Sequence, residues 1–193
     1  MKLTKEFWEK RYQNNDTGWD VGSITPPLKA YFDQLKDKSC SILIPGAGNA
    51  YEAEYLNTLG FSNVTVADIA PAAVLKFKQR VEGFPKQHII NANFFELNGQ
   101  YDYIIEQTFF CAIDKNLRLD YVTKAHQLLR PKGKIVGVMF NAPLNEDHPP
   151  FGGSIAEYKD YFNPLFDIQI MELAYNSIKP RSGREIFVKM IKK

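Results

Sequence analysis

The sequence predicts an α/β fold: a doubly wound, mostly parallel sheet of seven strands whose last strand pair is antiparallel. One observation is the alternation of short apolar runs with helical segments between residues 41 and 162. The other is the ending, where two strand-like runs, residues 166–174 and 185–192, follow each other with only a loop between them. Strands connected without a crossover helix pair antiparallel or lie apart, whereas parallel strands need the crossover.

Two helices precede the first strand. Thr4 is a candidate N-cap for a helix over residues 4–13, on which Trp8 and Tyr12 lie one turn apart. Residues 14–27 form a loop rich in Gly, Asp, Thr and Pro. Pro27 suits the first turn of a second helix, which we expect to end near Leu35.

The middle of the chain carries the parallel strands. Residues 41–45 form an apolar run that stops at Pro-Gly-Ala-Gly, as a buried strand entering a tight turn does. Further strands are predicted at residues 63–67, 88–92, 101–106 and 133–140, and helices at residues 49–58, 71–81, 116–129 and 155–162. No repeat, low-complexity stretch or linker interrupts this series, so residues 1–193 are expected to form a single domain.

Composition excludes several function classes. At ~150 residues per domain, 193 residues make about one domain. The 24 basic and 22 acidic residues nearly cancel, which argues against a nucleic-acid surface. Cys40 and Cys111 are too few for a disulfide framework, and the three histidines lie too far apart to suggest a metal site. Because no signal peptide or membrane-spanning run is present, we expect a cytoplasmic protein without membrane or nucleic-acid partners.

A glycine turn and an acidic residue point to the ligand. Gly46-Ala47-Gly48 stands between a strand and a helix, where glycines let the backbone approach a ligand and the helix offers free amides. Asp68 ends the second strand, 20 residues beyond Gly48, and a carboxylate there accepts both hydroxyls of a ribose. The alternatives are an ordinary tight turn and an N-cap for the helix that begins at Pro71. Together the two features favour an adenosine ligand.

The third glycine position of the turn separates the possible ligands. A dinucleotide-binding turn has the pattern Gly-x-Gly-x-x-Gly, but Tyr51 occupies the third position here, which disfavours NAD and FAD. A phosphate-binding P-loop is absent because no Gly-Lys-Ser/Thr sequence occurs. S-adenosylmethionine has no phosphate and tolerates a bulky residue at this position. A parallel sheet closed by an antiparallel pair is also the expected layout of a class I methyltransferase.

Segments throughout the chain resemble the thiopurine and thiol/halide methyltransferase family. Residues 7–12 and 17–22 resemble its entry motif, a WxxxW helix before a T-x-W-D-x-G loop. Residues 44–48 match its glycine turn, residues 101–113 resemble the fourth-strand region of the plant thiol/halide branch, and residues 128–133 match the turn before strand five. His148-Pro149-Pro150-Phe151 resembles its Pro-Pro-aromatic motif. The resemblance implies a Rossmann-like class I methyltransferase with residues 1–37 as an N-terminal helical lid.

The resemblance also implies site residues. Trp8 and Tyr12 would lie on a helix that covers the cofactor, with Tyr12 in place of the second Trp of the family pattern. The other cofactor contacts would be Trp19, which also touches the acceptor; Gly46 and Gly48 at the methionine; Asp68 at the ribose, with Ile69 beside it; Asn93 and Phe94 at the adenine; and Gln107 at the methionine end or the acceptor. Trp19, Phe151 and Arg118 would bind the acceptor.

Ordinary structural roles are the alternatives for some of these residues. Trp8 and Tyr12 have the spacing of core aromatics, and Phe94 can be core and adenine wall at once. Arg118 either steers an anionic acceptor or is a surface charge on its helix. Cys111 lies between apolar residues, which favours a buried structural thiol over a nucleophile.

Methyl transfer from a sulfonium requires alignment more than acid–base help. A thiol with a pKa of ~8.5 is already a few per cent thiolate at neutral pH, so a soft nucleophile needs no general base. The plant branch has a Tyr after the Pro-Pro pair, whereas Phe151 here has no hydroxyl. We therefore name no catalytic residue and expect an acceptor pocket lined by Trp19 and Phe151.

The sequence thus predicts an S-adenosylmethionine-dependent methyltransferase that acts on a small nucleophile, a thiol, sulfide or halide, and releases S-adenosylhomocysteine. A non-catalytic S-adenosylmethionine-binding protein and an NAD-dependent oxidoreductase are the alternatives. Because the family includes monomers, we expect a monomer.

Overall fold

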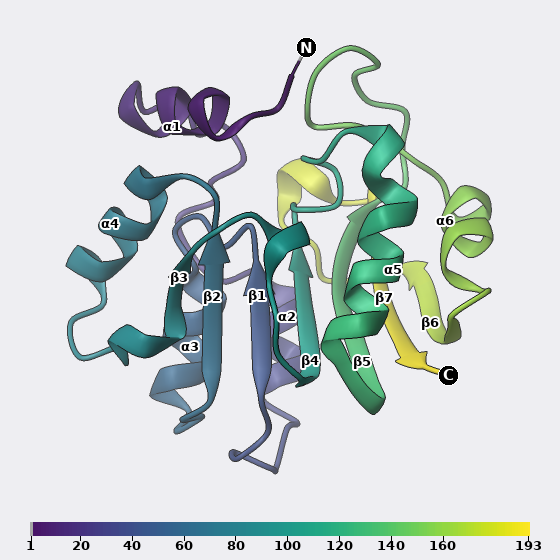
Figure 1. Ribbon diagram of the computed structural model, residues 1–193. Coiled ribbons are helices and arrows are strands. Elements are labelled where there is room, and N and C mark those ends of the chain that lie inside the picture. Colours follow the sequence, from purple (N-terminus) through teal and green to yellow (C-terminus); the bar gives the residue numbers. More distant parts are fainter. Residues whose placement is uncertain (1) are drawn as a thin grey trace.

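The strands form one twisted sheet in the order β3-β2-β1-β4-β5-β7-β6 (Figure 1). The structure is a computed structural model, and it describes residues 2–193. The strands are β1 (Ile42–Pro45), β2 (Val64–Asp68), β3 (Ile89–Asn91), β4 (Tyr101–Gln107), β5 (Leu129–Phe140), β6 (Phe166–Leu173) and β7 (Glu185–Lys192). The helices are α1 (Lys5–Gln13), α2 (Pro26–Phe32), α3 (Tyr51–Thr58), α4 (Pro71–Arg80), α5 (Arg118–Leu128) and α6 (Ile155–Phe162).

β7 runs antiparallel to both of its neighbours and lies between β5 and β6. Val138 of β5 pairs with Phe187, and Ile168 of β6 pairs with Met190. The pairs β1–β2, β1–β4, β2–β3 and β4–β5 are all parallel. The predicted fold class, with an antiparallel pair ending a parallel sheet, is therefore confirmed.

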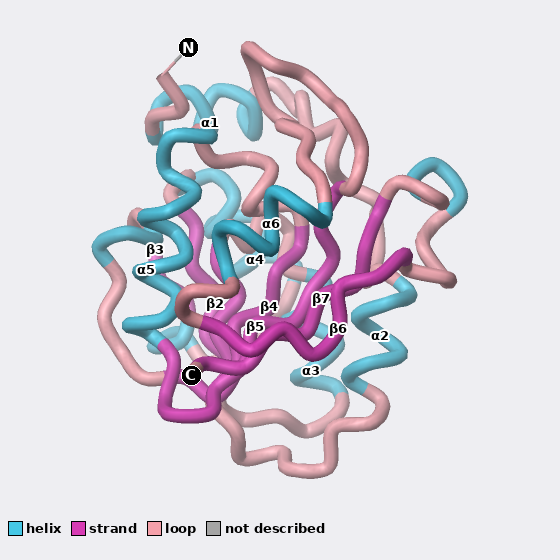
Figure 2. Tube along the Cα trace, turned by 90° about the vertical axis from the view of Figure 1, so that its right-hand side faces the viewer, coloured by secondary structure: helices cyan, strands magenta, loops and turns pink. Residues whose placement is uncertain are grey.

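Both faces of the sheet are apolar because successive residues of a strand point to opposite sides. Ile42 and Ile44 of β1 pack with residues of α2, α3 and α4, whereas Leu43 between them packs with residues of α5 and α6. Figure 2 shows this layering, with α2 and α3 on one side of the strands and α5 on the other. Each buried Leu or Ile contributes about 1.5–3 kcal/mol to folding.

Several elements differ from the sequence expectation, among them α2, which ends at Phe32 and not near Leu35. The first turn after β1 holds Ala50 in a left-handed conformation (φ 50°), so α3 begins at Tyr51 and not at residue 49. β5 begins at Leu129, which pairs with Tyr101 before the register shifts and Lys134 pairs with Tyr103. The sequence Arg-Pro-Lys-Gly is therefore an irregularity inside the strand. Four short 3₁₀ helices, Lys86–His88, Phe94–Glu96, Lys115–Leu117 and Lys179–Arg181, were not predicted.

The first helix lies beyond the carboxyl ends of β1, β2 and β4 (Figure 1). Thr4 is its N-cap, as predicted, because the Thr4 Oγ1 accepts a hydrogen bond from the Phe7 amide at 3.4 Å. Glu9 Oε2 accepts from the Ala72 amide at 2.8 Å, and Lys76 Nζ donates to the Tyr12 carbonyl at 3.2 Å. These bonds join α1 to the first turns of α4. Among residues 2–193, no helix is both long and apolar enough to cross a lipid bilayer.

Candidate active site

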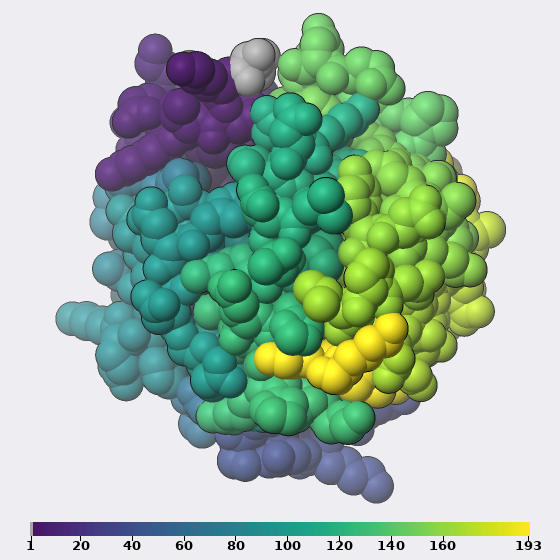
Figure 3. All heavy atoms as spheres, turned by 45° about the vertical axis from the view of Figure 1, so that its right-hand side comes forward, coloured from purple at the N-terminus to yellow at the C-terminus, as the bar shows by residue number. Residues whose placement is uncertain are grey.

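A cavity of about 480 Å³ opens at the carboxyl ends of the parallel strands. Its walls come from the N-terminal segment, the glycine turn, the ends of β2, β3 and β4, and the segments after β4 and β5. Figure 3 shows the N-terminal segment (purple) and the segment after β5 (light green) at this same end of the molecule. The ten residues predicted to contact the cofactor all border it: Trp8, Tyr12, Trp19, Gly46, Gly48, Asp68, Ile69, Asn93, Phe94 and Gln107.

The glycine turn requires glycine for two reasons. Gly46 and Gly48 have φ of 57° and 54°, a left-handed conformation that glycine adopts without steric cost. The space is also filled, since a Cβ on Gly46 would lie 2.2 Å from Phe109 Cδ2. A Cβ on Gly48 would lie 2.9 Å from the Tyr12 hydroxyl. The turn therefore allows α1 and the segment after β4 to approach its backbone closely.

Asp68 lies beside this turn at the end of β2. Its two carboxylate oxygens each accept one backbone hydrogen bond at 2.8 Å, Oδ2 from Gly48 and Oδ1 from Ala70. A carboxylate has about four lone-pair sites, so about two remain for a ligand. Burial raises the pKa of Asp68 to about 6, although the two amides oppose that shift. The N-cap of α4 is Ala70 and not Asp68, so the N-cap alternative for Asp68 is wrong.

Three aromatic side chains of the N-terminal segment form a cluster over the turn. The ring of Trp19 meets the rings of Trp8 and Tyr12 edge to face, with both centroid distances 5.6 Å. The Arg11 guanidinium lies 4.8 Å from the Trp19 ring centroid. The Trp19 carbonyl accepts a hydrogen bond from Arg181 Nη2 at 2.7 Å, which fixes this segment to the loop before β7.

The far walls of the cavity come from β3 and β4. Phe94 belongs to the core and borders the cavity at once, as predicted, and it stacks on Tyr121 at a centroid distance of 5.1 Å. Asn93 precedes it and accepts from the Phe95 amide at 3.2 Å. Gln107 Oε1 accepts from the Thr25 hydroxyl at 3.1 Å. These residues thus line the same cavity as the glycine turn and Asp68.

Two predicted acceptor residues lie outside the cavity wall. Phe151 is 7% exposed, and its amide donates to the Cys111 carbonyl at 2.7 Å. Arg118 is fully buried, so a surface charge is the wrong interpretation, and its guanidinium does not border the cavity either. The neighbouring Pro149 and Pro150 do border it.

Cys111 is a buried free thiol, as the structural interpretation expected. It borders the cavity, but burial raises its pKa to about 12. At neutral pH the sulfur is therefore protonated and a poor nucleophile.

Sequence reasoning missed three charged residues of the site region. Glu52 and Arg181 border the cavity, and burial raises the pKa of Glu52 to about 7. Glu106 lies behind the wall, where Oε1 accepts from the Phe109 and Phe110 amides at 2.8 Å each and Oε2 accepts from the Tyr121 hydroxyl at 2.9 Å. Glu52 is in the first turn of α3, where an acidic residue needs no function to be explained. Arg181 ends the short 3₁₀ helix Lys179–Arg181, which the sequence did not predict, so no pattern marked it.

The residues on the wall fit S-adenosylmethionine. The buried Asp68 carboxylate has free lone pairs that can accept hydrogen bonds from ribose hydroxyls. The glycine turn has no side chains at Gly46 and Gly48, so a ligand can contact its backbone closely. Aromatic faces attract a sulfonium charge by about 0.5–2 kcal/mol.

Comparison with known proteins decides the family. The family model described as thiopurine S-methyltransferase (TPMT) matches residues 3–192. The chain belongs to the thiopurine S-methyltransferase family. A probable thiol methyltransferase 2 of Arabidopsis thaliana is 26% identical over 185 residues, covering 92% of this chain and 81% of its own. A thiopurine S-methyltransferase of Acinetobacter baylyi is 25% identical over 193 residues, covering 88% of each chain.

Solved structures agree with the fold. The 1,6-didemethyltoxoflavin-N1-methyltransferase of Burkholderia thailandensis, crystallised with S-adenosylhomocysteine, superposes with a TM-score of 0.75 at 17% identity, over 99% of this chain and 87% of that one. This thiopurine S-methyltransferase family member therefore has the class I methyltransferase fold and is an S-adenosylmethionine-dependent methyltransferase.

Gly46→Ala tests the glycine turn. The new Cβ would both strain a left-handed residue and displace Phe109, so we expect a loss of about 2–5 kcal/mol of unfolding free energy. Gly60→Ala is the matched control, because Gly60 is left-handed (φ 86°) but has nothing within 4 Å of an added Cβ. It should cost only about 1–2 kcal/mol. Urea unfolding measures both, and equal losses would show that Phe109 does not restrict the turn.

The raised pKa of Asp68 predicts a pH dependence of cofactor binding. Ribose hydroxyls donate to the ionised form, so a protonated Asp68 must lose its proton before binding. S-adenosylhomocysteine affinity should be constant above pH 7 and fall up to about tenfold per pH unit below about 6. Asp68→Asn should bind about 1.5–3 kcal/mol more weakly and lose this dependence. Calorimetry from pH 5 to 8 measures the affinity of wild type and of Asp68→Asn. The pH dependence that the variant loses belongs to Asp68, and any that it keeps belongs to other groups such as Glu52. Parallel profiles would contradict the role of Asp68.

Proposed function

We propose that this methyltransferase transfers the methyl group to the sulfur of a small thiol or sulfide, with halides as related acceptors. The observation that carries the proposal is the division of one cavity into two kinds of wall. Near β1, β2 and β3 the wall holds the glycine turn, Asp68 and Asn93. Near β4 and β5 it is mainly apolar, with Cys111, Ala112, Ile113, Leu117, Phe140, Pro149 and Pro150, and its polar members there are Gln107, Thr108 and Asp114.

S-adenosylmethionine, when bound, supplies an activated methyl group on a sulfonium sulfur. We assign Asp68 and Ile69 to its ribose, Gly46 and Gly48 to its methionine portion, and Asn93 and Phe94 to its adenine. Gln107, which Thr25 holds by a hydrogen bond, is assigned to the methionine end. This assignment leaves the apolar wall for the acceptor.

An apolar acceptor wall suits a soft sulfur nucleophile. It removes water from a thiolate and holds the sulfur in line, and orientation alone can supply up to ~7–11 kcal/mol of the barrier. Because a few per cent of a thiol of pKa ~8.5 is ionised at neutral pH, the reaction needs no dedicated base. The names of the matched relatives, thiol and thiopurine S-methyltransferases, support sulfur as the acceptor atom.

We further propose that residues 2–25 form the lid of the site and that one chain is sufficient for activity; the expected lid of residues 1–37 was too long, because α2 packs on a face of the sheet. Asn49 Nδ2 donates to Asp20 Oδ2 at 2.5 Å, and Thr25 and Arg181 bind Gln107 and the Trp19 carbonyl as described above. Both cysteines are free thiols, in keeping with the expected cytoplasmic location.

An acceptor screen tests the proposed reaction. Wild-type protein with S-adenosylmethionine should release S-adenosylhomocysteine in the presence of thiophenol, small alkyl thiols or hydrosulfide. Alkyl amines should react less, because at neutral pH almost all of an amine is protonated and has no free lone pair. Asp68→Ala is the inactive control. Tight S-adenosylhomocysteine binding without turnover of any thiol, sulfide, thiocyanate or halide would identify a non-catalytic binding protein. Tight NAD binding without S-adenosylmethionine binding would identify an oxidoreductase.

Tryptophan fluorescence tests the lid. The sequence has two tryptophans, and both Trp8 and Trp19 border the cavity, so S-adenosylhomocysteine should change the emission of the protein. Trp19→Ala should weaken binding by about 0.5–2 kcal/mol, the range of one cation–π contact. Tyr175→Ala is the control, because Tyr175 is 93% exposed and outside the cavity. Unchanged emission and affinity in the Trp19 variant would rule out the aromatic lid.

A further inference from the structure

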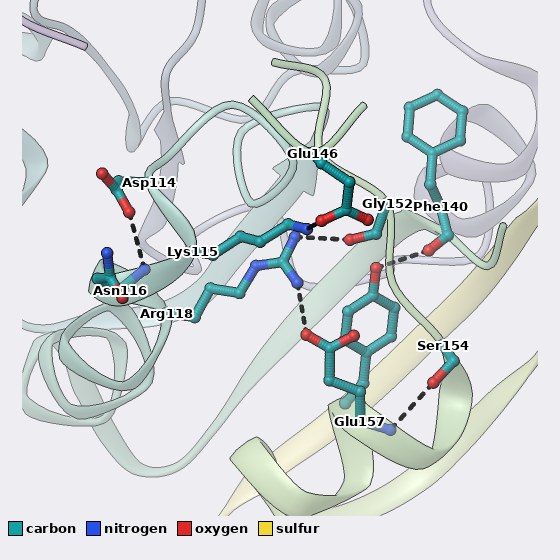
Figure 4. Close-up of polar contacts among 10 residues, drawn as sticks. Asp114, Lys115, Asn116, Arg118, Phe140, Glu146, Gly152, Ser154 and Glu157 are labelled. Carbon is teal, nitrogen blue, oxygen red and sulfur yellow. Dashed lines mark hydrogen bonds and ion pairs between the residues drawn. The ribbon is translucent and has the colours of Figure 1, made fainter. Parts of the chain in front are cut away.

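Arg118 is a charged side chain in an unusual place. It begins α5, and none of its surface is exposed. Nη1 donates to Glu157 Oε1 of α6 at 2.7 Å, and Nη2 donates to the Gly152 carbonyl at 2.8 Å (Figure 4). The guanidinium carbon also lies 4.9 Å from the Phe110 ring centroid. One side chain thus joins α5, α6 and the segment between β5 and α6.

This burial is costly. A buried guanidinium loses its hydration, and an ion pair with a half-exposed carboxylate returns only part of that loss. The side chain of Glu157 is 37% exposed, and the Nε of Arg118 has no hydrogen-bond partner. An apolar residue of similar size would join α5 to α6 at a lower cost. The bond to the Gly152 carbonyl is the contact that an apolar residue would not provide.

Gly152 belongs to the segment of residues 141–154, which carries part of the cavity wall. Pro149 and Pro150 of this segment border the cavity, and the next amide, that of Phe151, donates to the Cys111 carbonyl. A Cβ on Gly152 would lie 2.3 Å from the Ala142 carbonyl, so the two ends of the segment are in close contact. Arg118 therefore holds the segment two residues beyond the prolines that face the acceptor side.

We propose that Arg118 is a positioning residue that sets the acceptor wall formed by Pro149 and Pro150. It does not contact the acceptor; it fixes the backbone that does. The inference rests on the proposed function, because it assigns the apolar half of the cavity to the acceptor. It replaces the sequence expectation that the Arg118 charge itself binds the substrate.

Arg118→Met tests the proposal by comparing its effect on the acceptor KM with its effect on S-adenosylhomocysteine binding. Removal of the charged donor frees the Gly152 carbonyl, and a displacement of ~1 Å at a reactive site can cost up to ~100-fold. We expect the acceptor KM to rise about tenfold while the dissociation constant of S-adenosylhomocysteine stays within about twofold. Thiophenol and hydrosulfide serve as acceptors, and calorimetry with S-adenosylhomocysteine counts the folded sites.

Glu146→Gln is the matched control. Glu146 lies on the same segment and pairs with Lys115, just before α5, at 2.7 Å (Figure 4). Its side chain is 85% exposed, and exposed ion pairs contribute little to stability, so both constants should stay within about twofold of wild type. Arg118→Lys is the second variant, since one ammonium lacks the guanidinium fork that reaches Glu157 and Gly152 together, and it should give an intermediate KM. If Arg118→Met does not fold, the Lys variant takes its place in every comparison.

Amide hydrogen exchange provides a readout that needs no turnover. In Arg118→Met, exchange should accelerate in residues 143–153 and stay unchanged in residues 46–48 and 68–70, whereas Glu146→Gln should match wild type. An unchanged acceptor KM, or an equal loss of S-adenosylhomocysteine affinity, would overturn the proposal. If wild type methylates no acceptor, the proposed function fails, and the exchange comparison still decides whether Arg118 holds the segment.

Discussion

The site depends on one hydrogen bond, from the Gly48 amide in the turn after β1 to Asp68 at the end of β2. It can form because β1 and β2 are parallel neighbours, so the residues that follow them meet at one end of the sheet. The bond fixes the glycine turn, and the turn in turn fixes two other parts. Phe109 packs against Gly46, and the Tyr12 hydroxyl lies against Gly48. The Asp68 carboxylate, α1 and the wall after β4 thus all contact a single backbone turn.

Two buried carboxylates near the cavity, Asp68 and Glu106, differ in how many hydrogen bonds they can still accept. This difference distinguishes a carboxylate that is available to a ligand from one that supports the wall. Burial raises the pKa of Asp68 and of Glu106 alike, to about 6 and about 7. Glu106 accepts three hydrogen bonds from the protein and fixes the amides of Phe109 and Phe110. Asp68 accepts two and borders the cavity, so it retains capacity for a ligand. A raised pKa alone would not have separated them.

The sequence could predict the features that depend on local spacing. The turn at Gly46, the acidic residue at Asp68 and the aromatic pair Trp8 and Tyr12 each follow from a strand end or a helical repeat. It could not predict Arg181 or the true position of Arg118, because both depend on segments distant in sequence. Arg181 reaches the Trp19 carbonyl across 162 residues, and Arg118 reaches the Gly152 carbonyl across 34. No periodicity within one element carries that information.

The role of the residue after the Pro-Pro pair also depends on contacts that local spacing does not reveal. The resemblance raised the question of whether Phe151, which lacks the hydroxyl of a Tyr, removes an acidic or basic group from the acceptor site. Phe151 is buried beside the wall and does not border the cavity, and its ring lies 5.7 Å from the Lys115 ammonium. The missing hydroxyl therefore removes nothing from the described cavity wall. The segment contributes Pro149 and Pro150 to the cavity wall instead, and the Phe151 amide and Arg118 hold the backbone next to them through the Cys111 and Gly152 carbonyls.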